Sequence, residues 1–296
     1  MQDTLISVYE NNPRLLAERA RLREIDETYV QARAQGRPTI AGSGSIAQSW
    51  VGLPGGAAVF TGGAETGDIN ISGRPNELAM QIIQPLYQGG RVKALKAQAK
   101  LGILAARENL RAQENDLFLS AASAYVDVRR DLETIRIRRN NVTVLSRQME
   151  AATARFDVGS GTRTDVAQSE SRLALSEAGL AQAEAQLSVS EATYLRLVGQ
   201  EPKGLTSPPI YTLPPTLPDA IAAARENNPQ LIGSYFNEAA GRAAIDVAKA
   251  AGRPTFSISG GISRQREQIA QLQSIDAASI TAQVSIPLYS GGANTS

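Results

Sequence analysis

Apolar residues alternate with small polar residues in two segments near the end of the chain. The apolar positions are Phe256, Ile258 and Ile262 in the first segment and Ile280, Val284 and Ile286 in the second. A period of two is typical of β-strands with one apolar face. Each segment has roughly the 10 residues that a tilted strand needs to cross a bilayer. The sequence therefore predicts a strand pair, although a soluble hairpin packed on a protein core has the same period.

The stretch from residue 89 to residue 200 repeats its small and apolar residues every three or four positions instead. It is rich in Ala, Gln, Glu, Arg and Leu and contains no proline. This spacing predicts helix with a narrow apolar seam, and a first arm of roughly 65 residues would measure on the order of 100 Å. Gly159 and Gly161 interrupt the pattern, and Thr162 or Thr164 can cap the helix that follows. We expect a long helical hairpin, with an ordinary helical bundle as the alternative.

Two short motifs occur twice in the chain at the same spacing. Glu-Asn-Asn-Pro begins at Glu10 and at Glu226, and Gly-Arg-Pro-Thr begins at Gly36 and at Gly252, both 216 residues apart. Matches in register indicate an internal duplication. A third motif, Pro-Leu-Tyr-x-Gly-Gly, also occurs in both copies. Each copy predicts a helix followed by a strand, a loop and a second strand.

The helix of each copy is expected to run from about Asn12 to Gln35 and from about Leu217 to Ala251. Gly-Arg-Pro should end it, because glycine accepts a left-handed turn and proline cannot continue a helix. The first strand pair is less regular, since Ile83 interrupts the alternation. The glycine-rich stretch 50–75 between its strands predicts a mobile turn rather than a packed element.

These patterns divide the chain into seven segments. They are a helix (1–37), a strand pair (38–88), the long helical hairpin (89–200), a proline-rich linker (201–217), a second helix (218–252), a second strand pair (253–290) and the start of a further hairpin (291–296).

The composition argues against an enzyme. The chain has no cysteine and no histidine, which removes the commonest metal ligands and the commonest general base. We therefore expect no catalysis, no metal site and no cofactor. Asp127, Asp131 and Glu133 are candidate catalytic carboxylates, but the neighbouring arginines favour a solvated, ion-paired helix face. With 30 basic and 29 acidic residues, the chain has no broad field to attract nucleic acid.

The sequence also restricts how the chain can enter a membrane. No run of about 18 apolar residues occurs, so no transmembrane helix is predicted. A membrane span would have to use strands. The start, Met-Gln-Asp-Thr, lacks the charged and apolar regions of a signal peptide. We therefore expect an exported form to have lost that peptide already.

The order of elements, the doubled Pro-Leu-Tyr-x-Gly-Gly and the turn sequence from Arg155 to Val166 resemble the TolC family. The resemblance covers essentially the whole chain. It implies a mainly α protein with a β-barrel portion, in which each chain of a homotrimer gives four transmembrane strands to one barrel and its long antiparallel hairpins to a coiled-coil tunnel. The family's second repeat also carries a hairpin, and this chain stops soon after Tyr289, so we expect a fragment.

The resemblance further implies a function and a location. The protein would be the exit duct of a tripartite efflux pump or a type I secretion system, conducting passively in the outer membrane of a Gram-negative bacterium and extending into the periplasm. The implied partners are further copies of the chain, a periplasmic adaptor (membrane-fusion) protein, an inner-membrane RND or ABC transporter and outer-membrane lipid, without nucleic acid. A periplasmic coiled-coil adaptor and a structural scaffold are the alternatives, and the cargo stays open.

In the TolC family the adaptor docks at the hairpin tip, and the tunnel is closed near it. The corresponding tip positions are Phe156, Val158, Gly159, Ser160 and Gly161, and the corresponding gate positions are Arg163, Thr164 and Asp165. A ring of three Asp165 carboxylates would repel itself and respond to pH. A single Asp165 in the first turn of a helix would instead favour the helix dipole. Both interpretations stay open on the sequence.

Overall fold

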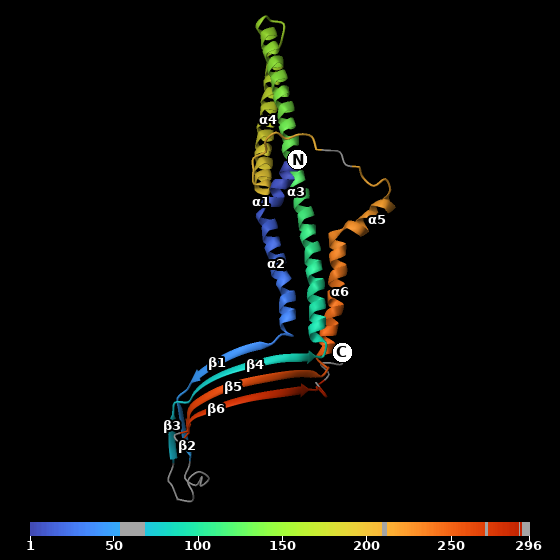
Figure 1. Cartoon of the computed structure of the whole chain (residues 1–296). Helices are drawn as coiled ribbons and strands as arrows, with labels where there is room; N and C mark the ends of the chain where they lie inside the picture. The colour runs from blue at the N-terminus through green and yellow to red at the C-terminus, as the bar shows by residue number, and fades with distance from the viewer. Residues whose placement is uncertain (54–68, 209–211, 270–271, 290, 292–296) are drawn as a thin grey trace, which may run out of the picture. The chain divides into compact units, whose positions relative to one another are not determined.

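The helices and strands follow the order that the sequence predicts, and the structure adds several short elements. The computed structural model describes residues 1–53, 69–208, 212–269, 272–289 and 291. The elements are α1 (Gln2–Asn11), α2 (Pro13–Ala34), β1 (Thr39–Ile46), β2 (Ser49–Leu53), β3 (Ile69–Gly73), β4 (Asn76–Gln88), α3 (Arg91–Asp157), α4 (Arg163–Val198), α5 (Leu217–Asn227), α6 (Pro229–Ala250), β5 (Thr255–Ile269) and β6 (Leu272–Ser285) (Figure 1). Within these ranges, no helix combines the length and the apolar character needed to pass through a bilayer.

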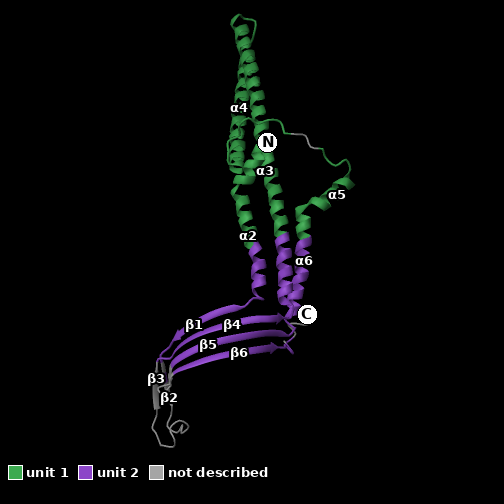
Figure 2. Ribbon diagram, in the orientation of Figure 1, with its two compact units in different colours: residues 1–24, 105–234 green, residues 25–104, 235–296 purple. Residues whose placement is uncertain are grey.

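The chain divides into two compact units (Figure 2). Unit 1 comprises Met1–Glu24 and Ala105–Ser234, and unit 2 comprises Ile25–Leu104 and Tyr235–Ser296. Unit 1 contains α4 and most of α3, and unit 2 contains the strands and the first turns of α3.

The core of unit 1 lies where α1 packs against the base of the hairpin. The buried cluster consists of Val8, Leu15, Leu117, Ala121, Ala124, Tyr125, Val128, Tyr194 and Val198. The rings of Tyr125 and Tyr194 have centroids 6.5 Å apart, within the range of favourable aromatic pairs. Ser7 Oγ donates to the carbonyl of Val198 at 3.1 Å, which ties α1 to the end of α4. The predicted helical hairpin is confirmed.

The helix expected from about Asn12 to Gln35 is present as α2, with α1 before it, but the single helix expected from about Leu217 to Ala251 is wrong, because the Glu-Asn-Asn-Pro motif divides it into α5 and α6. Asn12 and Asn228 both have extended backbones, with ψ of 120° and 111°, since proline disfavours helical geometry in the residue before it. Asn12 Oδ1 accepts from the N–H of Arg14, and Asn228 Oδ1 accepts from the N–H of Gln230. Each asparagine therefore caps a new helix, as is usual for this residue at an N-cap.

In unit 2, strands β1, β4, β5 and β6 form one antiparallel sheet in that order. Thr39 is opposite Ile83, and Thr255 is opposite both Gln88 and Ser285. A bulge lies between Pro85 and Tyr87, because proline has no N–H to donate to the ladder. The four predicted strands and their antiparallel pairing are confirmed.

The glycine-rich stretch between the first two strands contains more structure than predicted. β2 and β3 form a separate two-stranded antiparallel sheet, in which Ser49 is opposite Gly73. The expected turn is therefore shorter than residues 50–75. Strands pair through main-chain hydrogen bonds, so a segment that is rich in small residues can still form them. Residues 54–68, where most of those glycines lie, fall outside the described residues, and so does 292–296, the expected start of a further hairpin.

The glycines of the two Gly-Arg-Pro motifs do not adopt the left-handed turn that the sequence predicts. Among the described glycines with positive φ, neither Gly36 nor Gly252 occurs. A Cβ at Gly36 would instead lie 3.2 Å from Cγ1 of Val92 on α3. The glycine therefore lies in close contact with the helix, and its place there does not depend on a left-handed backbone.

Left-handed glycines occur at the junction between β4 and α3. Gly89 and Gly90 have φ of +60° and +86°, a conformation that residues with a Cβ rarely adopt. A Cβ at Gly89 would also lie 2.6 Å from the carbonyl oxygen of Ala250. The Gly-Gly that closes the Pro-Leu-Tyr-x-Gly-Gly motif therefore makes a tight turn from strand to helix against the end of α6.

Candidate functional site

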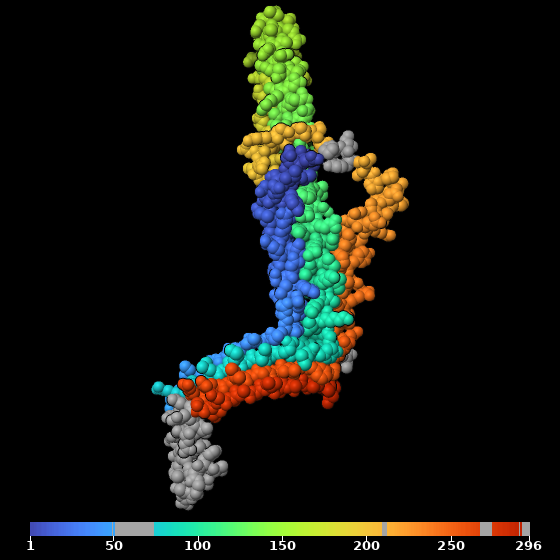
Figure 3. All heavy atoms as spheres, viewed as in Figure 1, coloured from blue at the N-terminus to red at the C-terminus, as the bar shows by residue number. Residues whose placement is uncertain are grey.

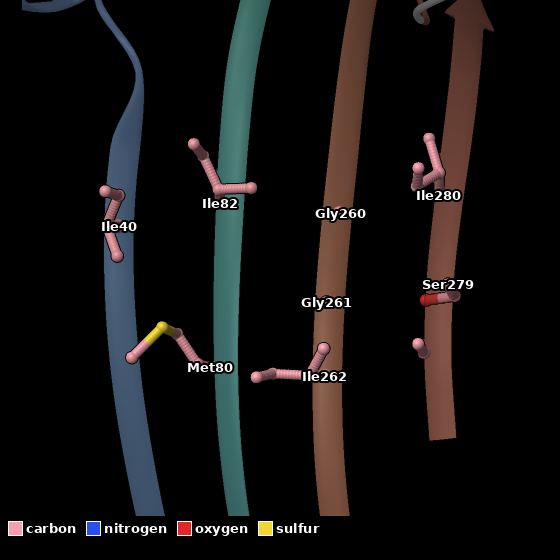
Figure 4. A pocket seen from close by; sticks show the side chains of 9 residues that line it. Ile40, Met80, Ile82, Gly260, Gly261, Ile262, Ser279 and Ile280 are labelled. Atoms are coloured by element: carbon pink, nitrogen blue, oxygen red, sulfur yellow. The ribbon is translucent and has the colours of Figure 1, made fainter.

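The register of the sheet gathers the alternating apolar residues on one face. Ile40 is opposite Ile82, Ile82 is opposite Gly260, and Gly260 is opposite Ile280. The adjacent row on the same face consists of Gly42, Met80, Ile262 and Ala278. Side chains of both rows, from all four strands, line a shallow hollow on this face (Figure 4). We call this surface the apolar face.

No described part of the chain covers the apolar face. Ile280 is 87% exposed, and Ile40, Leu78 and Ile262 are also exposed. The other predicted strand positions, Phe256, Ile258 and Val284, are exposed as well, and Ile286 lies one residue past the end of β6. An apolar patch of this extent marks a contact with another protein or with a membrane. For the described residues, the alternative of a soluble hairpin packed on the chain's own core is wrong.

The opposite face of the sheet is small and polar. It carries Thr39, Ser43, Gln81, Ser257, Ser259, Ser263, Ser279, Thr281 and Gln283. Ile83, which interrupts the sequence alternation, is opposite Thr39 and Ser259 and therefore belongs to this face. One apolar and one small polar face is the pattern of a strand between lipid and an aqueous interior.

The two ends of the apolar face differ in chemistry, and the alternating pattern along the strands does not predict this difference. At one end the rings of Tyr87 and Phe256 have centroids 6.2 Å apart. At the other end Arg264 Nε and Nη2 donate to the two carboxylate oxygens of Asp276 at 2.7 and 2.8 Å. The described rows between these ends carry no charged residue on this face. Aromatic and charged residues that bound an apolar band are typical of membrane interfaces.

The hairpin tip is a tight turn whose geometry requires both of its glycines. Gly159 has φ of +75° and its N–H donates to the carbonyl of Phe156, while the N–H of Ser160 donates to the carbonyl of Arg155. This pair of bonds is the Schellman ending of a helix. A Cβ at Gly161 would lie 3.2 Å from the backbone nitrogen of Phe156.

The side chains at the tip are open to contact. Val158 is 78% exposed, and Phe156 is exposed beside it. In the space-filling view, no other described segment of unit 1 lies on this end of the hairpin (Figure 3). The structure thus brings the predicted tip positions together as a small apolar surface.

Substitution of Gly159 by alanine is expected to destabilise the hairpin by about 1–2 kcal/mol, because a Cβ strains a left-handed backbone. The matched control is Gly102→Ala within α3, where a Cβ meets nothing within 4 Å. That change should stabilise the protein by about 0.5–1 kcal/mol, since alanine is the better helix former. Urea unfolding followed by circular dichroism measures both. Equal effects of the two substitutions would contradict the assigned turn.

Of the three predicted gate positions, Asp165 has the most defined role within this chain. Thr162 is the N-cap of α4, and its Oγ1 accepts from the N–H of Asp165 at 3.2 Å. In return, Oδ2 of Asp165 accepts from the N–H of Thr162 at 3.0 Å and from its hydroxyl at 2.7 Å. This reciprocal arrangement is a capping box. Arg163 and Thr164 occupy the first two positions of the same helix.

The capping box makes a pH dependence of the hairpin predictable. The hydroxyl and the N–H of Thr162, with a smaller contribution from Arg155, lower the pKa of Asp165 below its ordinary value of 3.8. Because the folded-state pKa is the lower one, this stabilisation is complete above pH 3.8 and is lost as the pH falls from there through the lowered pKa. We expect the contribution of Asp165 to the stability of the hairpin to be lost only below about pH 3.8, and Asp165→Asn to remove that part of the acid-induced decrease.

Unfolding midpoints measured across the acid range check this expectation. A loss of stability that instead occurs near neutral pH and disappears in Asp165→Asn would show a raised pKa. That result would fit carboxylates held close together in an assembly and would contradict the cap as the dominant influence on Asp165.

The candidate catalytic carboxylates on α3 are occupied by structural contacts. Asp127 pairs with Arg130 at 2.8 Å, and Glu133 pairs with Arg136. Asp131 is not solvated as the sequence suggested, because it is 5% exposed and its Oδ2 accepts from Ser190 Oγ at 2.6 Å. Charge and helical spacing gave no signal for this burial, which results from packing against α4. Within the described part of the chain, no group of three or more carboxylates can hold a metal ion.

Comparison with known proteins relates the chain to one family of outer membrane proteins. The model of the family described as outer membrane efflux protein matches residues 5–200 and 220–296. Over 291 residues the chain is 32% identical to the outer membrane efflux protein BepC of Brucella suis biovar 1 (strain 1330). The match covers 97% of this chain and 60% of BepC, so the chain spans less than two thirds of that relative.

Solved membrane proteins share the fold at low sequence identity. CusC superposes with a TM-score of 0.79 at 18% identity, over 99% of this chain and 67% of CusC. A membrane protein from Pseudomonas aeruginosa superposes with a TM-score of 0.80 at 18% identity, over 99% and 68%. The open state of the MtrE outer membrane channel of Neisseria gonorrhoeae has a TM-score of 0.73 at 19% identity, over 99% and 64%.

These matches confirm the resemblance to TolC-family channels and the mainly helical fold with an antiparallel strand portion. The relatives named are efflux and channel proteins rather than enzymes. The family match covers most of the chain, including the hairpin and the sheet. The chain belongs to the outer membrane efflux protein family and is located in the outer membrane.

Proposed function

We propose that the protein is the exit duct of a tripartite efflux pump or a type I secretion system and conducts its cargo passively through an aqueous interior. The observation that carries this proposal is the bare apolar face, backed by a small polar face on the same four strands. Outer-membrane lipid covers the first, and water fills the space behind the second. The chain needs no catalytic group for this function.

The edges of the sheet support assembly with further copies of the chain. In the described order, β1 and β6 are the outer strands and each pairs on one side. In lipid every backbone N–H and C=O must be paired, so an open edge is not tolerated. β1 and β6 run antiparallel to each other, so β6 of one copy can pair with β1 of the next until the barrel closes. We propose that three copies close it.

Disulfide trapping tests this assembly without background, because the chain contains no cysteine. Ser43→Cys on β1 is combined in turn with Ser279→Cys, Thr281→Cys or Gln283→Cys on β6, all on the small polar face. At least one pair should give covalently linked dimers and trimers on non-reducing gels of outer membranes, and Ser43→Cys alone should give only monomers. Monomers from every pair would contradict the closed barrel.

The hairpin tip is proposed as the contact for a periplasmic adaptor, which couples the duct to an inner-membrane RND or ABC transporter. Val158 and Phe156 offer exposed apolar side chains on a hydrogen-bonded turn, and apolar anchors of this kind are typical of protein interfaces. Arg163, Thr164 and Asp165 remain the proposed gate, next to this contact.

A conductance measurement tests the duct itself. The full-length protein, reconstituted in planar bilayers, should produce discrete ion-conducting steps, and Val158→Asp should leave these steps unchanged while reducing drug export or secretion in cells. A protein that fractionates with the outer membrane but never conducts would indicate a scaffold. Equal export by Val158→Asp and the parent would remove the tip from the adaptor contact.

A further inference from the structure

Positive charge is concentrated where the helices of unit 2 join its sheet. The three joining segments are 28–38, 89–104 and 247–254, and together they carry eight basic residues and no acidic one. These basic residues are Arg33, Arg37, Arg91, Lys93, Lys96, Lys100, Lys249 and Arg253. The whole chain has a net charge of only +1, so this local excess is balanced by acidic residues elsewhere.

The topology brings the three segments to one end of the sheet. The first segment leads into Thr39 of β1, the second follows Gln88 of β4, and the third leads into Thr255 of β5. Gln88 is directly opposite Thr255. This is also the aromatic end of the apolar face, where Tyr87 contacts Phe256.

Three of the basic residues form a stripe on α3. Lys93, Lys96 and Lys100 have the spacing i, i+3 and i+7, which places them on one side of a helix. Lys93 and Lys100 are exposed, and Lys96 is partly exposed. No ion pair within the described residues neutralises any of the three. We call these residues the lysine stripe.

Helix stability does not account for the lysine stripe. The first turn of α3 contains no acidic residue, and basic side chains near a helix N-terminus oppose the macrodipole. Arg33 and Lys249 differ in this respect, because they lie in the last turns of α2 and α6, where positive charge is favourable. Lys93 is therefore placed against the local preference of its own helix, whereas Lys96 and Lys100 lie beyond the first turn, where the macrodipole neither favours nor opposes them strongly.

The position of Arg91 indicates which side of α3 the stripe occupies. Arg91 lines a hollow whose lining residues from the sheet lie mostly on its small polar side, namely Ile83, Pro85, Gln88, Thr255 and Ser257, while Tyr87 and Phe256 come from the apolar face. At 3.6 residues per turn, the three lysines are rotated by about 140–200° around the helix from Arg91. The stripe thus faces the side on which the apolar face lies.

We propose that the lysine stripe binds the phosphate groups of anionic phospholipids, in the leaflet that borders the aromatic end of the apolar face. The proposal rests on the proposed function, because it requires the apolar face to lie in a bilayer. Basic residues immediately beyond a membrane span attract anionic headgroups, and long lysine side chains extend along apolar surface to reach them. The stripe fits phosphatidylglycerol better than a zwitterionic lipid.

Headgroup selection by the full-length protein tests the proposal. The protein is reconstituted in nanodiscs that contain equal amounts of phosphatidylglycerol and phosphatidylcholine, purified in detergent, and its retained lipid is measured by mass spectrometry. The parent should retain several-fold more phosphatidylglycerol. The triple variant Lys93→Gln, Lys96→Gln, Lys100→Gln should lose this preference. Each lysine should change the ratio of retained phosphatidylglycerol to phosphatidylcholine by about fivefold at most. High salt should weaken the parent's preference.

Two further variants separate charge selection from general damage. Arg147→Gln, Arg172→Gln, Arg225→Gln removes the same charge from exposed positions of unit 1 and should retain the parent's preference. Replacing all three lysines of the stripe by arginine should retain it as well. Loss of the preference in the unit 1 variant, or no loss in the glutamine variant of the stripe, would overturn the proposal.

The remaining outcomes are also decisive. If the glutamine variant alters the ratio of anion to cation permeability and leaves lipid retention unchanged, the stripe faces the aqueous interior and the proposal is wrong. Insertion into the mixed nanodiscs is measured in parallel. Failure of the parent to insert there would refute the proposed function, whereas insertion without headgroup preference would refute only the lipid site.

Discussion

Replacing Ile280 by arginine is expected to destabilise the membrane-inserted protein by about 2–4 kcal/mol, the range measured for a basic residue at the middle of a lipid-facing strand. Ile280 is in the row of Ile40, Ile82 and Gly260, midway between the Phe256 and Arg264 rows. It is 87% exposed, so no packing within the chain is lost. The expected effect therefore arises from placing a charge in lipid.

The matched control is Thr281→Arg, one residue further along β6 and on the small polar face. Unfolding by guanidinium in detergent or lipid, compared for the two variants, checks the prediction. The threonine variant should change stability by much less, because its charge can reach water. A larger loss in Thr281→Arg than in Ile280→Arg would place lipid on the other face of the sheet and contradict the proposed orientation.

Replacing Tyr125 by alanine is expected to destabilise unit 1 by about 3–5 kcal/mol, as for other large aromatic residues removed from a core. Tyr125 is 1% exposed and packs against Tyr194. Its hydroxyl also donates to the carbonyl of Thr206 and accepts from the N–H of the same residue, both at 2.8 Å. This side chain therefore joins the hairpin to the start of the proline-rich linker.

Tyr125→Phe separates the two contributions, because it keeps the ring and leaves both backbone groups of Thr206 without their partner. We expect it to lower stability by about 1–3 kcal/mol. Tyr235→Ala, at a position 65% exposed in unit 2, serves as the control and should change stability by less than about 0.5 kcal/mol. Thermal unfolding of the helical signal measures all three. A small effect of Tyr125→Ala would contradict the assigned core.

The strands and the hairpin were predictable because their periods are local. Phe256, Ile258 and Ile262 alternate with small polar residues, and a strand places alternate residues on opposite faces whatever surrounds it. The hairpin turn was predictable for a similar reason, since Gly159 and Thr162 have strong preferences for helix ends. The helix breaks were not predicted, although Asn12-Pro13 and Asn228-Pro229 carry a recognisable signal for them.

The sequence by itself determined which residues share a face of each strand and where the long helices reverse, because backbone preferences act over a few neighbouring positions. Only the tertiary structure decided that the apolar face is bare, that Asp131 is buried and bonded to Ser190, and that Gly36 packs closely against Val92. Burial depends on which distant segment packs against a residue. Periodicity cannot specify that, since it is the same for a face turned to lipid and a face turned to a protein core.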